Sequence, residues 1–375
     1  MARTFAIESV TATIVDVPTI RPHRLSSLST SVQNYVIVRV RAANGAEGIG
    51  EAATLGGPRW SEECVEGIKA VIDAHLSAAV IGEDASRFEY IAARMDMAAK
   101  RNNAAKAAIE SALFDLVGKT HGLPVHALLG GQVCDRIRVL WTLASGDPAQ
   151  EIEEAEAKLA ARKHNIFKVK LGAQSPQADM ARLGQIANAL GDRADLIIDA
   201  NQAWSEAVAI RCADQCADLG IRLIEQPLPA WDVAGMARLR ARSRVPLMAD
   251  EAVLSVHDAA TVGAAGAADV VSLKLVKHGG LLATGRVAAV CEAAGMALYG
   301  GCLLESSVGA AAHLQLFASL RNLPWHCEHF GPQILVDDLV TEPLAFEDFN
   351  ILLPSGPGLG VTLDEDKIRH FARKT

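Results

Sequence analysis

Residues 166–172, IFKVKLG, alternate apolar side chains with lysines. Alternation with a period of two is typical of a β-strand, in which successive side chains point to opposite faces. Lys168 and Lys170 therefore share one face of the expected strand. Two ammonium groups on one face fit either a solvated edge strand, where charge discourages aggregation, or a lysine pair in an active site.

Seven further short apolar runs alternate with helical patterns between about residue 132 and residue 330. Residues near the C-terminal ends of the eight runs recur at intervals of 24 to 29 residues, which is about the length of one strand–helix unit. They are Trp141, Lys170, Asp199, Glu225, Asp250, Lys274, Tyr299 and Glu328. Eight such units indicate a parallel sheet closed into a barrel of the triosephosphate-isomerase type. A doubly wound open sheet is the alternative, but it predicts a G-x-G-x-x-G fingerprint that we do not find. A closed barrel has no edge, which favours the active-site interpretation of the lysines.

The chain before about Gly131 has a different, α+β pattern. Residues 11–17 and 34–42 predict strands, and the alanine-rich stretch at 103–120 predicts a helix. The tail after about Pro332 lacks further strand–helix units, so we expect it to pack back across this first part.

The composition excludes several classes of protein. The chain has 375 residues, half of them apolar, with a formal net charge of −8 and scattered basic residues that do not suggest a nucleic-acid partner. No apolar run reaches the ~18 residues that span a membrane, and the stretch MARTFAIESV lacks the apolar core of a signal peptide. Seven cysteines without framework spacing favour a reducing compartment, so we expect a cytoplasmic protein.

Three consecutive runs end in an acid: Asp199, Glu225 and Asp250. The C-terminal ends of barrel strands form one rim, where functional groups collect. Converging buried carboxylates repel one another unless a cation lies between them, and oxygen ligands without His or Cys favour Mg²⁺ or Mn²⁺. Separate salt bridges or helix caps are the alternative. We predict that the three acids bind one divalent metal ion.

Lys274 ends the sixth run, which lies opposite the second run on a ring of eight. A substrate on the metal would therefore meet amines on both sides. An ammonium beside another cation has a lowered pKa and can act as a base, so we expect Lys168 to lower the pKa of Lys170. Glu328 would orient the substrate, accept a hydrogen bond from a lysine, or simply form a salt bridge.

Three neighbours of the acids complete the expected site. Asn201 and Gln226 would support the metal ligands from behind, and Glu251 points away from Asp250 if the alternation continues. A divalent cation, opposed amines and no evident nucleophile indicate proton chemistry next to a carboxylate. The enediolate that forms there carries negative charge, which a metal ion and flanking cations stabilise.

The motifs KVK (168–170), DAN (199–201), IEQP (224–227), ADE (249–251) and SLK (272–274) resemble those of the enolase superfamily. With Lys at 274 and no His–Asp dyad, the chain resembles the muconate-lactonizing subgroup, the muconate cycloisomerases. The stretches GIGEAATLGG, ESALFDLVGKTHGLPVHALLGG and LYGGCLLESSVG extend this resemblance over nearly the whole chain.

The resemblance implies a fold of class α/β, a modified TIM-type (β/α)7β barrel with an N-terminal α+β capping domain. The implied parts are a capping domain over residues 1–131 with lid loops near 17–31 and 52–61, a barrel over 132–335, and a C-terminal segment over 336–375 that packs on the capping domain. Lids exclude water and set specificity. Leu55 and Trp60 are then expected as pocket walls, with Asn201 also at the substrate.

The resemblance also implies residue roles. Asp199, Glu225 and Asp250 match the metal ligands. Lys170 matches the acid/base, and Lys168 lies beside it. Lys274 matches the lysine of the opposite face, and Glu328 matches the acid of the eighth strand. His329 stands where relatives often carry an apolar residue, a departure that bears on substituent preference.

The implied reaction is the cycloisomerization of the dicarboxylate cis,cis-muconate to muconolactone, a step of catechol breakdown, in a homo-oligomer that the resemblance suggests is an octamer. A chloromuconate cycloisomerase, a dipeptide epimerase or an o-succinylbenzoate synthase would use the same site. Dipeptide epimerases typically carry a D-x-D pair at the eighth strand, where this chain has the single acid Glu328. Two other classes of protein are alternatives. A Schiff-base aldolase on a barrel would need no metal ion, and a binding or scaffold protein would tolerate loss of the charged residues at the rim.

Overall fold

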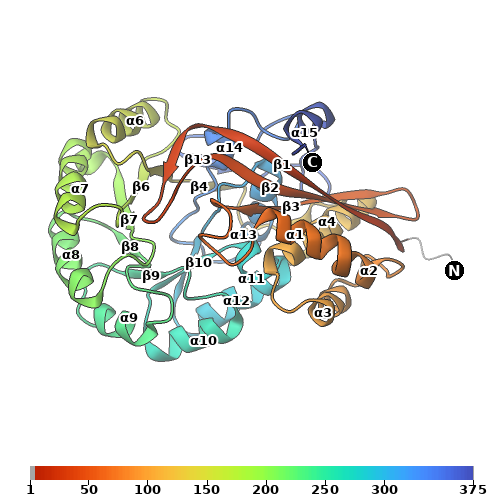
Figure 1. Cartoon of the computed structure of the whole chain (residues 1–375), viewed down its shortest axis with the longest axis horizontal. Coiled ribbons are helices and arrows are strands. Elements are labelled where there is room, and N and C mark those ends of the chain that lie inside the picture. The colour runs from red at the N-terminus through yellow and green to blue at the C-terminus, as the bar shows by residue number, and fades with distance from the viewer. Residues whose placement is uncertain (1–4, 375) are drawn as a thin grey trace.

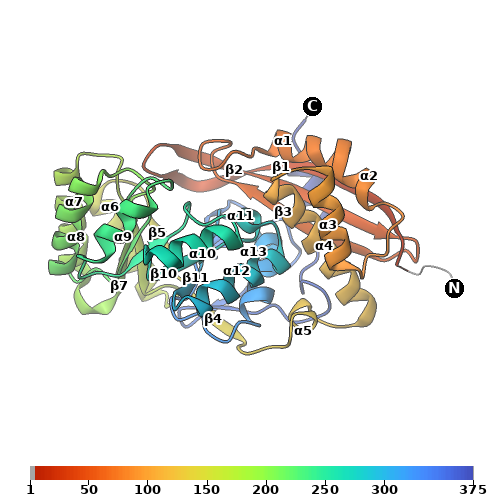
Figure 2. The same cartoon turned by 90° about the horizontal axis from the view of Figure 1, so that it is seen from below.

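A computed structural model describes residues 5–374. It contains an N-terminal antiparallel sheet with helices on it, a parallel barrel, and a short third sheet (Figures 1 and 2). Figure 2 shows α1 to α4 beside the N-terminal sheet at one end of the molecule and α6 to α9 at the other. No helix among the described residues is long and apolar enough to cross a membrane.

The N-terminal sheet has the order β1–β2–β3. Its strands are β1 (Ile7–Arg24), β2 (Ser29–Ala42) and β3 (Glu47–Thr54). The helices that follow are α1 (Val65–Val71), the π-helical turn η1 (Ile72–Leu76), α2 (Ser77–Val80), α3 (Phe88–Ala98), α4 (Asn103–His121) and α5 (Val125–Leu128). The alanine-rich helix α4 is buried from Ala104 to Gly118, and it packs on β2 and β3.

The barrel sheet has seven parallel strands in the order β11–β10–β9–β8–β7–β6–β5. The strands are β5 (Trp141–Leu143), β6 (Ile166–Lys170), β7 (Asp195–Asp199), β8 (Leu223–Glu225), β9 (Leu247–Ala249), β10 (Val270–Leu273) and β11 (Ala297–Gly300). The helices are α6 (Pro148–Ala160), α7 (Pro176–Leu190), the 3-10 turn η2 (Gly191–Arg193), α8 (Glu206–Asp218), α9 (Val233–Arg240), α10 (Val256–Ala265), α11 (Leu275–His278), α12 (Leu281–Ala293) and α13 (Ser307–Phe317). Strands that are buried on both faces explain the nearly continuous apolar runs of the sequence.

The eighth apolar run closes the ring without forming a regular strand. Cys327 bridges Gly300, at the end of β11, and Val139, just before β5. The N–H of Glu328 donates to Gly300 O at 2.8 Å, and the N–H of Leu140 donates to Cys327 O at 3.0 Å. The left-handed backbone of His326, with φ of 64°, interrupts the extended conformation, so the pairing is limited to a few residues.

The first predicted barrel run is also divided. Its beginning forms β4 (Arg136–Arg138), which joins a separate sheet with β12 (Phe346–Glu347) and β13 (Asn350–Leu352) in the order β12–β13–β4. The C-terminal part adds α14 (Gly331–Ile334) and α15 (Glu365–Phe371), and α15 contacts β1.

The expected loop at 17–31 is in fact the tip of the β1–β2 hairpin. Strand β1 continues to Arg24, only a short turn follows, and β2 begins at Ser29. The prolines at 18 and 22 suggest a loop, but β1 lies at the edge of its sheet, where a missing N–H is tolerated. The register shift between Pro18 and His23 accommodates them. The other expected loop, 52–61, begins inside β3 and becomes irregular only after Thr54.

Candidate active site

One cavity at the C-terminal ends of the barrel strands is lined by the ten residues that the sequence predicted as metal ligands, catalytic groups or substrate contacts, whereas Gln226 and Glu251 do not line it. The ten are Leu55, Trp60, Lys168, Lys170, Asp199, Asn201, Glu225, Asp250, Lys274 and Glu328. Four further residues complete the lining: His23, Cys302, Leu303 and Leu304. The hairpin tip, the segment after β3 and the barrel rim therefore enclose a single site.

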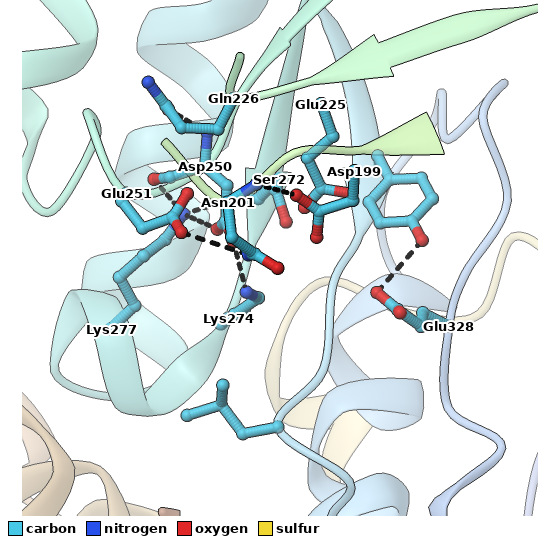
Figure 3. Close-up of polar contacts among 12 residues, drawn as sticks. Asp199, Asn201, Glu225, Gln226, Asp250, Glu251, Ser272, Lys274, Lys277 and Glu328 are labelled. Atoms are coloured by element: carbon cyan, nitrogen blue, oxygen red, sulfur yellow. Dashed lines mark hydrogen bonds and ion pairs between the residues drawn. The ribbon is translucent and has the colours of Figure 1, made fainter. Parts of the chain in front are cut away.

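Strand register places the acids side by side. Lys170 of β6 is paired with Asp199 of β7, and Asp199 is paired with Glu225 of β8. Neighbouring strands lie ≈ 4.8 Å apart, so side chains at paired positions on one face meet. Figure 3 shows the carboxylates of Asp199 and Glu225 lying next to each other. Asp250 follows β9 directly, on the next strand around the barrel.

The chain turns away from the strands immediately after these acids. Asn201 and Gln226 both adopt positive φ, of 39° and 29°. The N–H of Asn201 donates to Asp199 Oδ1 at 2.8 Å, and Gln226 Oε1 accepts from the N–H of Asp250 at 2.9 Å. The backbone N–H of Asn201 thus fixes the Asp199 carboxylate, and the Gln226 side chain fixes the backbone at Asp250.

Lys168 is fully buried between two carboxylates. Its Nζ lies 2.6 Å from Glu225 Oε2 and 2.6 Å from Glu328 Oε2. Burial alone would lower the pKa of Lys168, but the carboxylates of Glu225 and Glu328 raise it well above the usual value. The two carboxylates therefore favour the protonated form of Lys168 at the wall of the cavity.

Lys170 occupies a different environment two residues further on. Its Nζ donates to Asp199 Oδ2 at 2.5 Å and to Asn201 Oδ1 at 3.3 Å. Both lysines of the KVK motif therefore point into the barrel and not to solvent, and each has its own acidic partner.

Two lysines hold Asp250 on the opposite side of the site (Figure 3). Lys274 Nζ donates to Asp250 Oδ2 at 2.5 Å, and Lys277 Nζ donates to Asp250 Oδ1 and Asp250 O, each at 2.8 Å. Burial would raise the pKa of Asp250, but the two ammonium groups lower it strongly, so Asp250 is ionised. Burial would lower the pKa of Lys274, but Asp250 and Glu225 raise it.

Glu328 connects three strands at the base of the cavity. It accepts hydrogen bonds from Lys168, from Thr142 Oγ1 at 3.0 Å and from Tyr299 Oη at 3.1 Å. Burial would raise the pKa of Glu328, but the Lys168 ammonium lowers it. The placement favours a role in holding Lys168.

Trp60 and Leu55 both line the cavity, and Trp60 lies beside Lys274. The ammonium of Lys274 lies 4.2 Å from the centroid of the Trp60 ring, within the range of a cation–π contact. The Leu55 side chain is buried. Glu251 does not point away from the site, as alternation suggested, because its Oε1 accepts a hydrogen bond from Asn201 Nδ2 at 3.2 Å.

The donor set of the three acids fits a hard divalent cation. As the described side chains lie, the acids turn toward lysines, and no group of three His, Cys, Asp or Glu among residues 5–374 is arranged to hold a metal ion. Burial and the neighbouring Asp199 carboxylate raise the pKa of Glu225 well above its usual value. Glu225 Oε2 has the Lys168 ammonium 2.6 Å away, which offsets part of this repulsion. A cation at these oxygens would relieve the repulsion between the two carboxylates.

Among the buried side chains at the site that sequence reasoning missed, two are basic, Lys277 and His23. Lys277 lies one helical turn after Lys274, and the spacing i, i+3 in SLKLVKH is a signal that both amines share a face. His23 lies in the hairpin tip, where no periodicity marks an inward-facing residue.

The fold and this site define a class of enzyme. Acids at the ends of consecutive barrel strands, with lysines on both sides, form a site that is suited to stabilising an anion next to a substrate carboxylate.

Comparison with known proteins agrees with this class. The model of the mandelate racemase / muconate lactonizing enzyme N-terminal domain matches residues 9–130, and the enolase C-terminal domain-like model matches residues 150–367. Muconate cycloisomerase 1 of Pseudomonas putida is 47% identical over 370 residues, covering 98% of this chain and 99% of that protein. A chloromuconate cycloisomerase of Delftia acidovorans is 44% identical over 367 residues, covering 98% and 99%.

Solved structures show the same relationship. The muconate lactonizing enzyme from Pseudomonas fluorescens, complexed with muconolactone, superposes with a TM-score of 0.98 at 46% identity, covering 99% of this chain and 100% of that one. The chain therefore belongs to the mandelate racemase / muconate lactonizing enzyme family of the enolase superfamily.

Proposed function

We propose that this chain is a muconate cycloisomerase, which converts cis,cis-muconate to muconolactone in the breakdown of catechol. One observation carries the proposal. Lys170 and Lys274 face a single cavity from opposite sides of three strand-end acids, in a chain similar over nearly its whole length to muconate cycloisomerases.

Enzymes of this superfamily use a divalent metal ion, typically Mg²⁺ or Mn²⁺. Asp199, Glu225 and Asp250 would hold it here. When bound, such an ion supplies positive charge that stabilises the negative charge developing on a substrate carboxylate.

The chain's own side chains supply the proton and the remaining charge. One carboxylate of the substrate attacks the diene of the same molecule, a C–O bond forms, and the displaced electron pair gives an enediolate-type anion. Lys170 delivers a proton to the α carbon of that anion, and the same amine takes it back in the reverse direction. Lys168 and Lys274 stay protonated and stabilise the anion, and Glu328 fixes Lys168.

The parts of the chain would divide this work. Residues 1–131 would form the capping domain, of which 1–4 lie outside the described residues, 132–335 the catalytic barrel, and 336–375 a segment that packs on the cap. The hairpin tip and the segment after Thr54 would act as lids that exclude water.

The setting of the enzyme is also proposed. Seven free cysteines favour the reducing cytoplasm. The partner is a small dicarboxylate, and the assembly is a homo-oligomer, an octamer by resemblance.

Chloromuconate turnover is the second candidate function, because chloromuconate cycloisomerases are also 44% identical over nearly the full length. A substrate panel separates the candidates. We expect kcat/KM for cis,cis-muconate to exceed the value for each of three other substrates, all measured with Mn²⁺. These are 2-chloromuconate, a dipeptide as substrate of an epimerase, and the substrate of o-succinylbenzoate synthase. A higher value for any other substrate would reassign the function while keeping the site.

A further inference from the structure

The tip of the β1–β2 hairpin is fastened to the rim of the barrel. The N–H of Arg24 donates to Ala144 O at 3.1 Å, just after β5. Arg21 Nη2 donates to Thr142 O at 2.7 Å, and Ser26 Oγ donates to Asn201 O at 3.2 Å. These contacts place the residues between Arg21 and Ser26 over the ends of β5 and β7, across the site from Trp60 and Lys274.

His23 is the residue of this tip whose side chain lines the cavity. It is 2% exposed, and its Nδ1 has no hydrogen-bond partner. Its aromatic neighbour is Phe330, with ring centroids 6.4 Å apart. A buried polar group without a partner costs free energy, so a partner from outside the chain is expected.

Other buried histidines show what a structural role looks like. His313 Nδ1 donates to Gly309 O at 2.8 Å, and its Nε2 accepts from the N–H of Leu275 at 2.9 Å. His278 and His329 have unpartnered ring nitrogens, but neither lines the cavity. Among the described histidines, His23 is thus the one that combines an unpartnered nitrogen with a place at the active site.

The surroundings of His23 are cationic. Burial lowers its pKa well below the usual value, and Lys170, Arg21 and Lys168 lower it further. The imidazole is therefore neutral and carries one N–H, in a region where positive charge accumulates. An anionic oxygen is the partner that suits both the N–H and the surrounding ammonium and guanidinium groups.

We propose that His23 donates a hydrogen bond to the substrate carboxylate that does not lie on the metal ion, and so selects dicarboxylates over monocarboxylates. This inference rests on the proposed function for the identity of the substrate. It adds a specificity residue on the hairpin side of the cavity to the three pocket residues that the sequence nominated, Leu55, Trp60 and Asn201.

Calorimetry with two six-carbon acids tests the proposal directly. Adipate has two carboxylates and hexanoate has one, and both are titrated into the Mn²⁺-loaded protein. The wild type should bind adipate more tightly. The substitution His23→Ala should weaken adipate binding by about 10- to 100-fold, because a hydrogen bond to a charged group is lost. The same substitution should leave hexanoate binding unchanged. Replacing His23→Gln, which keeps an N–H donor, should restore most of the affinity.

The cross-strand partner of His23 provides a matched control. Thr30 pairs with His23 in the hairpin register but does not line the cavity, so Thr30→Ala should bind both acids as the wild type does. With muconate, His23→Ala should raise KM and leave kcat nearly unchanged.

Two results would overturn the inference: equal affinity of the wild type for the two acids, or losses of adipate affinity that are the same for His23→Gln and His23→Ala. Muconate turnover is scored separately on the wild type. If muconate is not converted but adipate binding still depends on His23, the proposed function fails and the dicarboxylate site stands. If muconate is converted but adipate binding does not depend on His23, the proposed function stands and the role of His23 is refuted.

Discussion

At the scale of single residues, the KVK motif places two chemically different lysines two positions apart. Lys168 is enclosed by Glu225 and Glu328, whose charges keep it protonated. Lys170 meets Asp199 and the amide of Asn201, and it lines the cavity. The alternation of a strand therefore delivers one fixed cation and one lysine that can reach a substrate.

Replacing Lys170→Ala should lower kcat by roughly 10²- to 10⁴-fold, because the proton carrier is lost while the binding groups remain. Steady-state kinetics with cis,cis-muconate and Mn²⁺ measures the effect. Lys69, which pairs with Asp73 and does not line the cavity, offers the control Lys69→Ala with unchanged activity. A Lys170→Ala enzyme within tenfold of the wild type would assign the proton transfer to another residue.

Some residues of the site could be predicted from a sequence pattern, and others could not. Asp199, Glu225 and Asp250 interrupt buried apolar strands, and a buried charge needs a reason, so the pattern nominates them. His23 follows two prolines in a stretch without periodicity, and its inward direction depends on where the hairpin tip lies in three dimensions. Glu251 was placed on the wrong side because alternation ends where the strand does.

At the scale of elements, helix α4 and strand β3 approach so closely that only glycine fits between them. A Cβ at Gly50 would lie 2.0 Å from Ala108 O, and one at Gly48 would lie 2.0 Å from Ala112 O. Both obstacles are backbone carbonyls of a buried helix, which cannot move aside as a flexible side chain does. The GIG sequence in β3 is therefore a packing requirement of the N-terminal sheet.

Gly50→Ala should destabilise the protein by roughly 1 to 3 kcal/mol, because the added methyl group forces α4 away from β3. Urea denaturation at constant pH measures the free energy of unfolding. Gly67→Ala is the matched control, since a Cβ there meets only Cys64 Sγ at 3.6 Å inside helix α1. Equal stabilities for the two variants would contradict the close approach.

Elements of strong periodicity were predictable, and elements defined by long-range contacts were not. The seven barrel strands and α4 coincide with the apolar runs and the alanine-rich stretch. The eighth run had the right composition, but the left-handed His326 limits it to a bridge at Cys327. The resemblance placed a lid loop near 17–31, and no pattern in those residues shows that β1 continues to Arg24.

At the scale of the whole molecule, buried acids join the N-terminal part to the barrel. Glu51 of β3 accepts a hydrogen bond from the N–H of Ser306 at 3.1 Å, at the start of α13. Glu110 of α4 accepts one from the N–H of Leu282 at 3.3 Å, at the start of α12. Burial raises the pKa of each carboxyl to about 8. We therefore expect the contact between the two parts to depend on pH.

Glu110 should make the folded protein less stable as the pH rises. Its folded pKa of about 8 lies above the ordinary value of 4.5, so its contribution is fully present below pH 4.5 and is lost as the pH rises through about 8. Glu110→Gln removes this dependence. The fall in the free energy of unfolding between pH 5 and pH 8 should therefore be smaller in the variant than in the wild type by roughly 3 to 5 kcal/mol. Urea denaturation across this range measures it.

The exposed pair of Glu206 and Arg238, which does not affect the pKa of Glu110, supplies the comparison. Glu206→Gln should leave the pH profile close to that of the wild type, because exposed ion pairs contribute little. A Glu110→Gln profile parallel to the wild type would show that Glu110 is ionised at neutral pH in the folded state.

The central claim, that three strand-end acids and opposed lysines form a metal-dependent cyclising site, is tested most directly by the ultraviolet absorbance of cis,cis-muconate mixed with the protein. The absorbance should fall with Mn²⁺ present, stop falling in excess chelator, and fall again when Mn²⁺ is restored, as the conjugated diene is consumed. A decay that continues in excess chelator, or no decay with either Mn²⁺ or Mg²⁺, would contradict the account.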